Sequence, residues 1–385
     1  MALTIEQTPQ LYTPSDNPVT WVFSSDQTAQ NNFYFLIEVY IDSVKVEEHK
    51  IFPEFENKAH FDASMITERF SKITSIQGIG FETDGDNYNS VRIDVSEYFG
   101  EPVSVGDLVS TSDVNVFKAR LTKRDFVNYD YNDYLLLDGV VTKPLTYFPN
   151  GEKNYISQGQ KAFISVLNSG DFIGTSVRTY DSLGNILNTY NILSSRLDKV
   201  LTFDVSMGNL TSVMGVDFTN AVRYDFIVLA TGGSTEMIFF DIDDRCNFTN
   251  TRLHFLNTLG GFDSFTFNLF DRENFKTESF GYERQYGDFN EAGVYSYGLE
   301  EGTNVDYIKR TSRELVLTSD WMNQNVQNWL VSQLYTSPVV YLERDGSLFR
   351  CKVVNSSFNY KKDKNDMTIQ EVVTLMLEND LSVNV

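Results

Sequence analysis

The chain has 385 residues, of which 53 are acidic and 31 basic, so its formal net charge is −22. This charge argues against a surface that grips nucleic acid, because phosphate binding draws its affinity from Lys and Arg. It fits solubility, or a surface past which a polyanion slides without sticking. The length suits two to four domains, and 41% hydrophobic residues allow each domain a core. The 30 Phe and 21 Tyr favour half-buried strands and large interfaces.

The cysteines and histidines are scattered, without the spacing of a zinc site. The two cysteines either form a disulfide or, as we expect, remain two buried thiols. We expect His254 to be hydrogen-bonded and partly buried in a strand, not a catalytic base. The first ten residues lack the features of a secretory signal, and no apolar run approaches a membrane helix; we therefore expect a soluble protein made in a cytoplasm. The residues concerned are Cys246, Cys351, His49, His60 and His254.

Residues 1–18 contain three prolines between mostly polar residues and are predicted to form an extended N-terminal arm. Residues 19–142 are predicted to form a first β-sandwich-like domain with one helix. Its strands cover 19–23, 33–41, 44–51, 91–95 and 114–121, and the first three form a meander typical of immunoglobulin-like or fibronectin-like sandwiches. The helix is predicted over 60–73, with Asp62 or Ser64 as its N-cap. For the acidic loop 78–90 we favour a solvated turn over a calcium site.

Residues 143–246 are predicted to form a second β-sandwich domain. Six segments of strand-like composition follow one another with turn signals between them, as in a sandwich. Residues 181–185 (DSLGN) are a hairpin turn. The predicted strands cover 161–167, 176–180, 186–192, 199–205, 222–229 and 237–241.

Residues 247–385 are predicted to form a C-terminal β domain. Dense alternation over 252–280 predicts a half-buried hairpin whose turn uses the conformational freedom of Gly260 and Gly261. A long segment over 273–307, rich in Tyr, Gly, Glu and Asn, is predicted to be an extended arm, and such long segments commonly have an interaction role. A helix is predicted over 319–335 with its N-cap at Ser319 or Asp320. Further strands cover 309–318, 339–343, 348–358 and 367–378.

The sequence contains no phosphate-binding loop, no nucleophile elbow and no zinc-protease motif. Asp241, Asp243 and Asp244 cluster after a predicted strand, but clustering by chance is expected among 53 carboxylates. We therefore expect no catalytic, cofactor-binding or metal-binding residues, and no enzyme activity. A hydrolase using paired carboxylates ranks well behind the other hypotheses.

Aromatic residues of the arm are the candidate site, because aromatic side chains anchor protein interfaces. The same rings in 282–297 could instead stack on sugars, which makes a carbohydrate-binding module the alternative. The candidate interface residues are Phe275, Phe280, Tyr282, Tyr286, Phe289, Tyr295 and Tyr297.

Several stretches resemble structural proteins of tailed bacteriophages, most of all tail, ring or baseplate proteins of crAss-like and other Bacteroidota phages. The most specific are LHFLNTLGGFDSFTFN and SDWMNQNVQNWLVSQLYTSPVVYL, and the resemblance spans most of the chain. It implies a virion component that assembles into a ring. The C-terminal order of strand, helix and three strands also looks like a tail-tube or distal-tail unit, in which an extended loop contacts the next ring.

These observations predict a non-enzymatic structural subunit of a phage tail, neck or baseplate that forms a homo-oligomeric ring and helps to form the DNA-ejection conduit. Its expected partners are other copies of itself and neighbouring tail or portal-proximal proteins. DNA would pass through the ring without specific binding, and no membrane contact or cofactor is expected. The alternative is a carbohydrate-binding or receptor-binding tail module.

Overall fold

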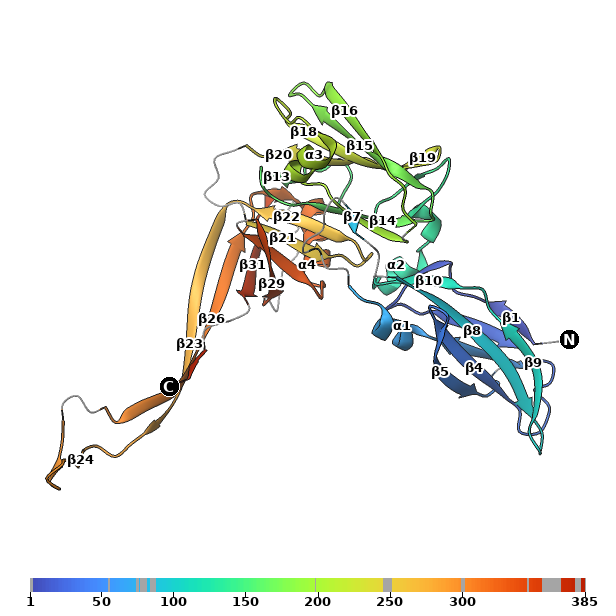
Figure 1. Cartoon of the computed structure of the whole chain (residues 1–385), viewed down its shortest axis with the longest axis horizontal. Coiled ribbons are helices and arrows are strands. Elements are labelled where there is room, and N and C mark those ends of the chain that lie inside the picture. Colours follow the sequence, from blue (N-terminus) through green and yellow to red (C-terminus); the bar gives the residue numbers. More distant parts are fainter. Residues whose placement is uncertain are drawn as a thin grey trace. The chain divides into compact units, whose positions relative to one another are not determined.

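The computed structural model is mainly β (Figure 1). It divides into two compact units. The first contains Met1–Asp244, His254–Phe265 and Ser332–Ser337, and the second contains Arg245–Leu253, Thr266–Val331 and Pro338–Val385. The residues described are 3–54, 56–73, 76, 82–83, 88–197, 199–244, 251–298, 302–344, 346–354, 368–377 and 382–384.

The first unit begins with a β-sandwich. One of its sheets has the order β1-β3-β6, and the other has the order β2-β10-β8-β4-β5, with β9 also paired to β8. Trp21, Phe35 and Ile93 lie between the sheets and are fully buried. The strands are β1 (Thr4–Gln7), β2 (Tyr12–Pro14), β3 (Thr20–Ser24), β4 (Tyr34–Ile41), β5 (Val44–Ile51), β6 (Lys58–Asp62), β8 (Tyr88–Phe99), β9 (Ser104–Ser110) and β10 (Val114–Phe117).

A second β-sandwich follows in the same unit. Its sheets have the orders β11-β14-β17-β7 and β12-β19-β18-β15-β16, with β20 paired to β18 and β13. Phe203 and Phe226 face each other across the core at 5.6 Å between ring centroids. The strands are β7 (Glu82–Thr83), β11 (Leu135–Leu136), β12 (Val141–Thr142), β13 (Tyr155–Ile156), β14 (Phe163–Asn168), β15 (Phe172–Tyr180), β16 (Ile186–Leu193), β17 (Val200–Asp204), β18 (Arg223–Ala230), β19 (Gly233–Thr235) and β20 (Ile238–Ile242).

The predicted class, multi-domain and mainly β with sandwich units, is confirmed, but the two sandwiches share one compact unit. A third cluster of buried side chains joins them, and it includes Tyr12, Tyr129 and Leu259. The Tyr12 hydroxyl donates a hydrogen bond to the Asn168 carbonyl at 3.3 Å, and the Tyr129 hydroxyl donates to the Tyr12 carbonyl at 3.1 Å. Two short helices precede β11 along the chain, α2 (Lys123–Val127) and η1 (Tyr131–Asp133).

Residues 3–18 are not an arm separate from the first sandwich. Strand β1 pairs antiparallel with β3, and β2 pairs parallel with β10. Tyr12 in β2 is 3% exposed, because its ring belongs to the cluster that joins the sandwiches. The segment is therefore part of the first sandwich.

The two sandwiches repeat one topology. In the first, the order is β3, β4, β5, β6, helix α1 (Ser64–Phe70), β8, and then β9 and β10, which both pair with β8. In the second, the order is β14, β15, β16, β17, helix α3 (Met207–Met214), β18, and then β19 and β20, which both pair with β18. An earlier strand joins each last strand in parallel, β2 on β10 and β13 on β20. The unit thus contains an internal duplication of these elements. Outside them the sandwiches differ: β7, which lies between α1 and β8 in the chain, pairs with β17 of the second sandwich, and β1 pairs antiparallel with β3 whereas β11 pairs parallel with β14.

A short sequence motif marks equivalent positions of the two copies: 61–65 reads FDASM and 203–207 reads FDVSM. In both, the Asp side chain accepts a hydrogen bond from the backbone N–H two residues later, at 2.9 Å for Asp62 and 3.0 Å for Asp204. The residue directly after each Asp donates its backbone N–H to a carbonyl just before a strand. Ala63 donates to Val19, before β3, and Val205 donates to Ala162, before β14. The motif therefore sets the same strand-to-helix corner twice.

Both long predicted helices begin later than expected. Residues 60–62 belong to β6, so α1 begins at Ser64 with Ala63 as its N-cap, and no side chain caps it. The second helix, α4 (Gln324–Leu334), begins after strand β27 (Met322–Asn323), which pairs with β30 (Thr368–Ile369). Asn323 Oδ1 accepts the N–H of Val326 at 3.0 Å, as an N-cap does, so Ser319 and Asp320 do not begin the helix.

The second unit is built on a sheet of order β22-β21-β28-β29-β31-β26-β23, with β32 also paired to β26. Leu315, Leu317, Val373 and Leu375 form its fully buried centre. Much of the predicted loop 78–90 lies outside the described residues. Residues 355–367, which include the end of the predicted strand 348–358 and the start of the predicted strand 367–378, also lie outside them. The strands are β21 (Thr251–Leu256), β22 (Phe262–Phe267), β23 (Phe270–Glu283), β26 (Asn304–Thr318), β28 (Val340–Arg344), β29 (Ser347–Val353), β31 (Val372–Leu377) and β32 (Ser382–Asn384).

The hairpin β21–β22 is buried on both faces, not half-buried as its alternation predicts. Its tip, His254–Phe265, belongs to the first unit. Gly260 has φ +85°, and a Cβ there would lie 2.4 Å from the Lys118 carbonyl oxygen. A Cβ on Gly261 would lie 2.2 Å from the Leu145 carbonyl oxygen. The Gly pair therefore permits close backbone approach, in addition to the turn conformation that the sequence predicts.

Replacing Gly260 with Ala is expected to destabilise the first unit more than the same change at Gly151. Both residues have φ near +85°, but a Cβ at Gly151 would meet no atom within 4 Å. Strain at positive φ costs about 1–3 kcal/mol at either position. The collision at Gly260 adds about 1–3 kcal/mol more, as overpacking does. Urea unfolding of the two variants measures the difference, and equal losses would contradict this packing of the tip.

Candidate functional site

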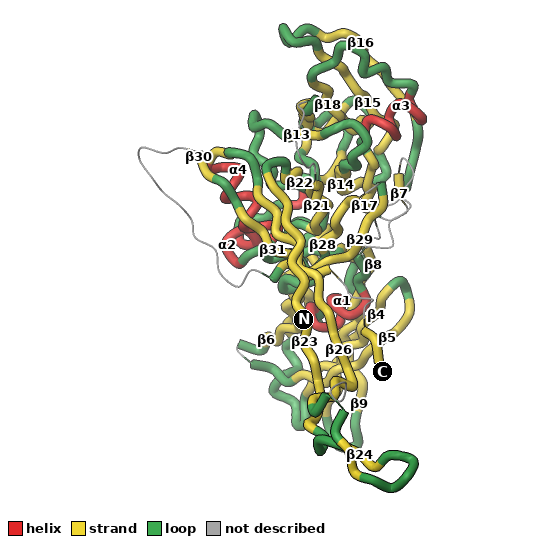
Figure 2. The backbone as a smooth tube through the Cα atoms, turned by 90° about the vertical axis from the view of Figure 1, so that its left-hand side faces the viewer, coloured by secondary structure: helices red, strands yellow, loops and turns green. Residues whose placement is uncertain are grey.

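The predicted arm is a two-stranded antiparallel ribbon. Strands β23 and β26 pair from Phe270 opposite Thr318 to Glu283 opposite Asn304, with a one-residue register shift between Phe280 and Gly281, and Figure 2 shows them running side by side towards β24. At about 3.3 Å per residue, the 14 residues of β23 extend about 46 Å. From Phe275 to Glu283, every residue of β23 is exposed. The segment is thus a ribbon with its own backbone hydrogen bonds, not a loop.

The base of the ribbon is held by an ionic clamp. Glu273 on β23 accepts hydrogen bonds from Arg313 on β26 at 2.9 Å and from Arg344 on β28 at 2.8 Å. The hydrogen bonds from Arg313 and then Arg344 hold the pKa of the Glu273 carboxyl below its usual value. The sequence gives no sign of the clamp, because Glu273 and Arg344 are 71 positions apart in the chain.

Three of the predicted interface residues lie along the shaft of the ribbon. The guanidinium of Arg313 lies 5.4 Å from the ring centroid of Phe275, and that of Arg310 lies 5.5 Å from Phe280. Both distances are in the range of cation–π attraction. Tyr282 is exposed and pairs opposite Val305. These side chains stiffen the ribbon while leaving aromatic surface in solvent.

The other four interface residues meet at the tip. Tyr286 and Tyr297 stack with 5.2 Å between centroids, and Tyr295 meets Tyr297 edge-on at 5.4 Å. Phe289 meets Tyr295 edge-on at 5.0 Å, beside the short strands β24 (Asp288–Phe289) and β25 (Tyr295–Ser296). The Tyr295 hydroxyl donates to the Tyr286 carbonyl at 2.8 Å and to that of Gly287 at 3.1 Å.

This tip cluster (Tyr286, Phe289, Tyr295 and Tyr297) is pre-formed and exposed. Phe289 is 67% exposed and Tyr297 is 65% exposed. Large rings fixed by their own contacts lose little side-chain entropy on binding, which is why such rings anchor interfaces. The sequence identified the residues, but their mutual contacts depend on the pairing of β24 with β25.

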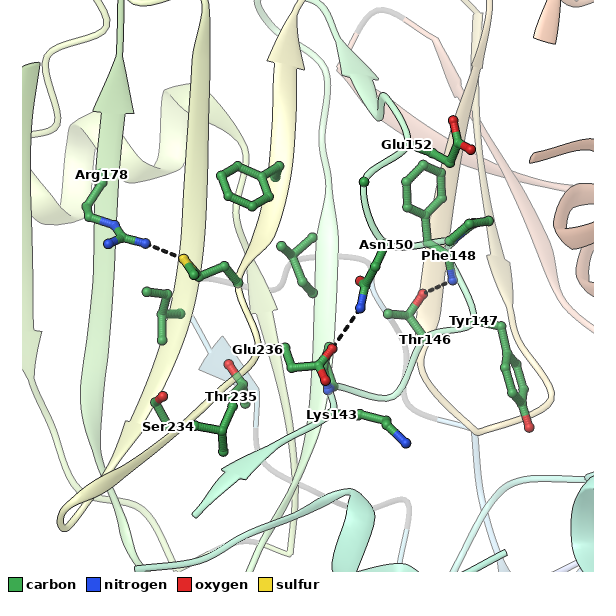
Figure 3. Close-up of a pocket in the computed structure, with 18 residues that line it drawn as sticks. Lys143, Thr146, Tyr147, Phe148, Asn150, Glu152, Arg178, Ser234, Thr235 and Glu236 are labelled. Carbon is green, nitrogen blue, oxygen red and sulfur yellow. Dashed lines mark hydrogen bonds between the residues drawn. The ribbon is translucent and has the colours of Figure 1, made fainter. Parts of the chain in front are cut away.

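A separate pocket lies in the second sandwich, and its volume is about 580 Å³. It is lined mainly by residues of the segments 143–152 and 234–239, and Figure 3 shows labelled side chains from both segments. Asn150 Nδ2 donates to Glu236 at 2.9 Å across it, and Arg178 at another wall hydrogen-bonds to Asp225. These polar groups already satisfy one another, so the pocket presents no assembled catalytic pair.

The residues considered for chemistry have structural contacts. Arg223 binds Asp241 Oδ1 at 2.7 and 2.9 Å, and His254 Nδ1 lies 2.7 Å from Ser264 Oγ in a fully buried position. Burial raises the pKa of the free Cys351 thiol to about 12, and Cys246 lies outside the described residues. Across the described ranges, the side chains form no group suited to hold a metal ion.

Among the described helices, none is long and apolar enough to cross a membrane. No family model and no curated protein matches the chain. Solved structures match weakly. The FN1–FN3 domains of chicken CNTN1 are 10% identical over 63% of this chain and 67% of theirs, with a TM-score of 0.20. Trypsin-activated alpha-2-macroglobulin from Escherichia coli is 9% identical over 83% of this chain and 22% of its own, also at 0.20. Such scores carry no argument, so the assignment of sandwiches rests on the strand orders above.

The ionic clamp makes a pH-dependent contribution to stability. Because the pKa of Glu273 is lowered in the folded chain, the stabilisation is present above the ordinary pKa of a Glu side chain, about 4.3. It is lost as the pH falls through the lowered folded-state value. A carboxyl NMR titration is expected to place the midpoint of Glu273 below the ordinary value, and Arg344→Leu is expected to move it upward. A midpoint unaffected by Arg344→Leu would contradict the clamp.

Proposed function

We propose that this protein is a non-enzymatic structural subunit of a bacteriophage tail, neck or baseplate that assembles with copies of itself into a ring. The observation that carries the proposal is the exposed tip cluster at the end of the long ribbon. Exposed aromatic surface of this kind marks an interaction site more often than a free surface. The resemblance of 253–268 and 319–342 to tail proteins supports the choice of a phage particle.

The ribbon suits a ring because ring contacts join two different surfaces. In a closed ring each copy presents one patch to the next copy and receives another. The ribbon has a clamped base, and its strand β23 is about 46 Å long. It can therefore carry the tip cluster to a surface of another copy. Neighbouring tail or portal-proximal proteins are the further partners we propose.

The charge of the chain is consistent with a conduit for DNA. With a net charge of −22, the protein lacks the excess of Lys and Arg that drives counterion release on DNA. DNA would then pass through the ring without being retained. We propose no cofactor and no catalytic residue, in keeping with the structural contacts of the carboxylates discussed above.

A carbohydrate-binding module is the weaker candidate. Sugar recognition by stacking needs free ring faces, but Tyr286 and Tyr297 cover one face of each other. Protein contact through the exposed edges and outer faces of the cluster agrees better with this geometry.

Removing the tip is expected to prevent ring assembly. Residues 284–303 can be replaced by an Asn-Gly turn, which joins the paired ends of β23 and β26. Mass photometry of the full chain is expected to show ring-sized particles, and that of the shortened chain smaller ones. As a matched control, Gln30→Lys with Asn31→Lys alters an exposed loop of the first sandwich and is expected to leave assembly intact.

Two results would contradict the proposal. One is a full chain that remains a strict monomer and is absent from virions, and the other is a shortened chain that assembles normally. A monomer that binds a glycan array through Tyr282, Tyr286 and Tyr295, with binding lost on their replacement by Ala, would favour the carbohydrate-binding alternative.

A further inference from the structure

One face of the first sandwich carries an apolar patch that points away from the core. Directly opposite residues of neighbouring strands share a face of the sheet, and two rows of such residues cross it here. The first row is Lys50, Leu36, Ser96 and Leu108, on β5, β4, β8 and β9, and the second is Tyr34, Tyr98 and Val105. The intervening residues of β4 and β8, such as Phe35 and Val95, belong to the core.

This aromatic face is pre-formed and exposed; we define it as Tyr34, Leu36, Phe52, Tyr98, Val105 and Leu108. Tyr34 and Tyr98 stack with 5.2 Å between their ring centroids, and the centroid of Phe52 lies 6.4 Å from that of Tyr34. Phe52 is 58% exposed, Val105 is 63% exposed and Leu108 is 61% exposed. Contiguous exposed apolar side chains of this kind mark an interaction site.

The internal duplication shows that the fold does not require the stacked pair. The two copies align at a Tyr that lies opposite an Arg, which is Tyr40 opposite Arg92 in the first and Tyr180 opposite Arg223 in the second. Six residues before Tyr40, Tyr34 lies opposite Tyr98. Six residues before Tyr180, Gly174 lies opposite Leu229. The second sandwich therefore forms without rings at these positions, so the pair in the first is free to serve a contact.

Lys50 gives the aromatic face a positive charge. Its Nζ lies 3.7 Å from the ring centroid of Tyr34 and 5.1 Å from that of Phe52, within the range of cation–π attraction. The next carboxylate on this side of β5 belongs to Glu48, which pairs with Lys45 at 2.8 Å. The face thus presents apolar rings and one cation in a chain whose net charge is −22.

The tip cluster of the ribbon has the complementary charge. Asp288 directly precedes Phe289, and Glu291 lies in the turn that joins β24 to β25; both carboxylates are exposed. Arg284, at the start of the same segment, donates back to the Gly302 carbonyl at 3.1 Å. An acidic tip is repelled by most surfaces of a strongly acidic copy, but a cationic apolar face attracts it.

We propose that the aromatic face of the first sandwich receives the tip cluster of a neighbouring copy, with Lys50 set against the carboxylates of the tip. This inference rests on the proposed function and identifies the surface that the tip contacts. The two surfaces differ, so each copy offers one tip and receives another, as a closed ring requires. Rings on both sides exclude water from the centre of the contact.

Two chains that each lack one half of the contact test it together. The face variant, Lys50→Glu with Leu108→Glu, keeps the tip but places carboxylates on the receiving surface, and both positions are exposed. The shortened chain, with 284–303 replaced by Asn-Gly, keeps the face but lacks the tip. Neither chain is expected to form rings alone. An equimolar mixture is expected to form a particle with one chain of each kind and nothing larger, because one complementary pair of surfaces remains.

Sedimentation velocity with a fluorescent label on one chain measures this particle. Adding the two face substitutions to the shortened chain is expected to raise the dissociation constant of the mixed particle at least about tenfold, because carboxylates then meet carboxylates. As a matched control, Lys123→Glu with Leu183→Glu makes the same charge change at two other exposed positions of the full chain. This control is expected to form rings as the wild type does, and circular dichroism checks that every variant is folded.

A crosslinking experiment leaves the face unchanged. A photoreactive phenylalanine analogue replaces Phe289 in the full chain, and unlabelled chains are mixed with isotope-labelled ones to identify links between copies. The links are expected to map to 34–52 or 96–108 of another copy.

The outcomes separate this inference from the proposed function. A folded face variant that forms rings, while the shortened chain forms none, would overturn the inference and leave the proposed function standing. A mixture without the mixed particle, or links that map to other segments, would overturn it as well. A wild-type chain that neither assembles nor gives links between copies would overturn both.

Discussion

The organisation of this protein depends on how the edges of its β-sheets are satisfied. Each outer strand presents a row of backbone N–H and C=O groups that must be paired, solvated or protected. In the second unit, β23 and β26 extend together beyond the rest of the sheet, so the ribbon satisfies its own inner edges. In the first sandwich, charged side chains protect β5. In the second sandwich, β16 has neither protection.

The duplication allows the charged edge β5 to be compared with the uncharged edge β16 at an equivalent place in the fold. In the two sandwiches the matched strands follow one another in the same order, with a helix at the same place. Two strands then pair with β8 in the first sandwich and with β18 in the second, yet the outer edges β5 and β16 differ. The shared features are those that form the fold, such as the corner set by Asp62 and Asp204. The edges do not contribute to the core, so their sequences are free to differ. A difference confined to such a surface is consistent with different roles in assembly.

The sequence predicted strand positions well where alternation was regular. In β4 every second residue is buried, as the pattern over 33–41 indicates. It failed at element ends: the helix predicted over 60–73 included residues 60–62, which alternate as the end of strand β6. Propensity cannot separate these periods in a short window. The repeated motif at 61–65 and 203–207 was visible in the sequence and would have revealed the duplication.

The candidate site was predictable in composition but not in contacts. Aromatic density over 275–297 identified the interface residues, yet the stacking of Tyr286 on Tyr297 depends on a local strand pair. The clamp at Glu273 joins residues 40 and 71 positions apart, and no local pattern signals it. Likewise, the burial of β2 follows from its pairing with β10, whereas proline content alone suggested an arm over 1–18.

The central claim is that the tip cluster makes a contact between copies in an assembled particle. A cryo-electron microscopy map of the assembled particle tests this most directly. The account predicts that density for each tip, around Phe289 and Tyr297, lies against the surface of a neighbouring copy. A particle in which every tip projects into solvent, with its rings touching no other chain, would contradict the account.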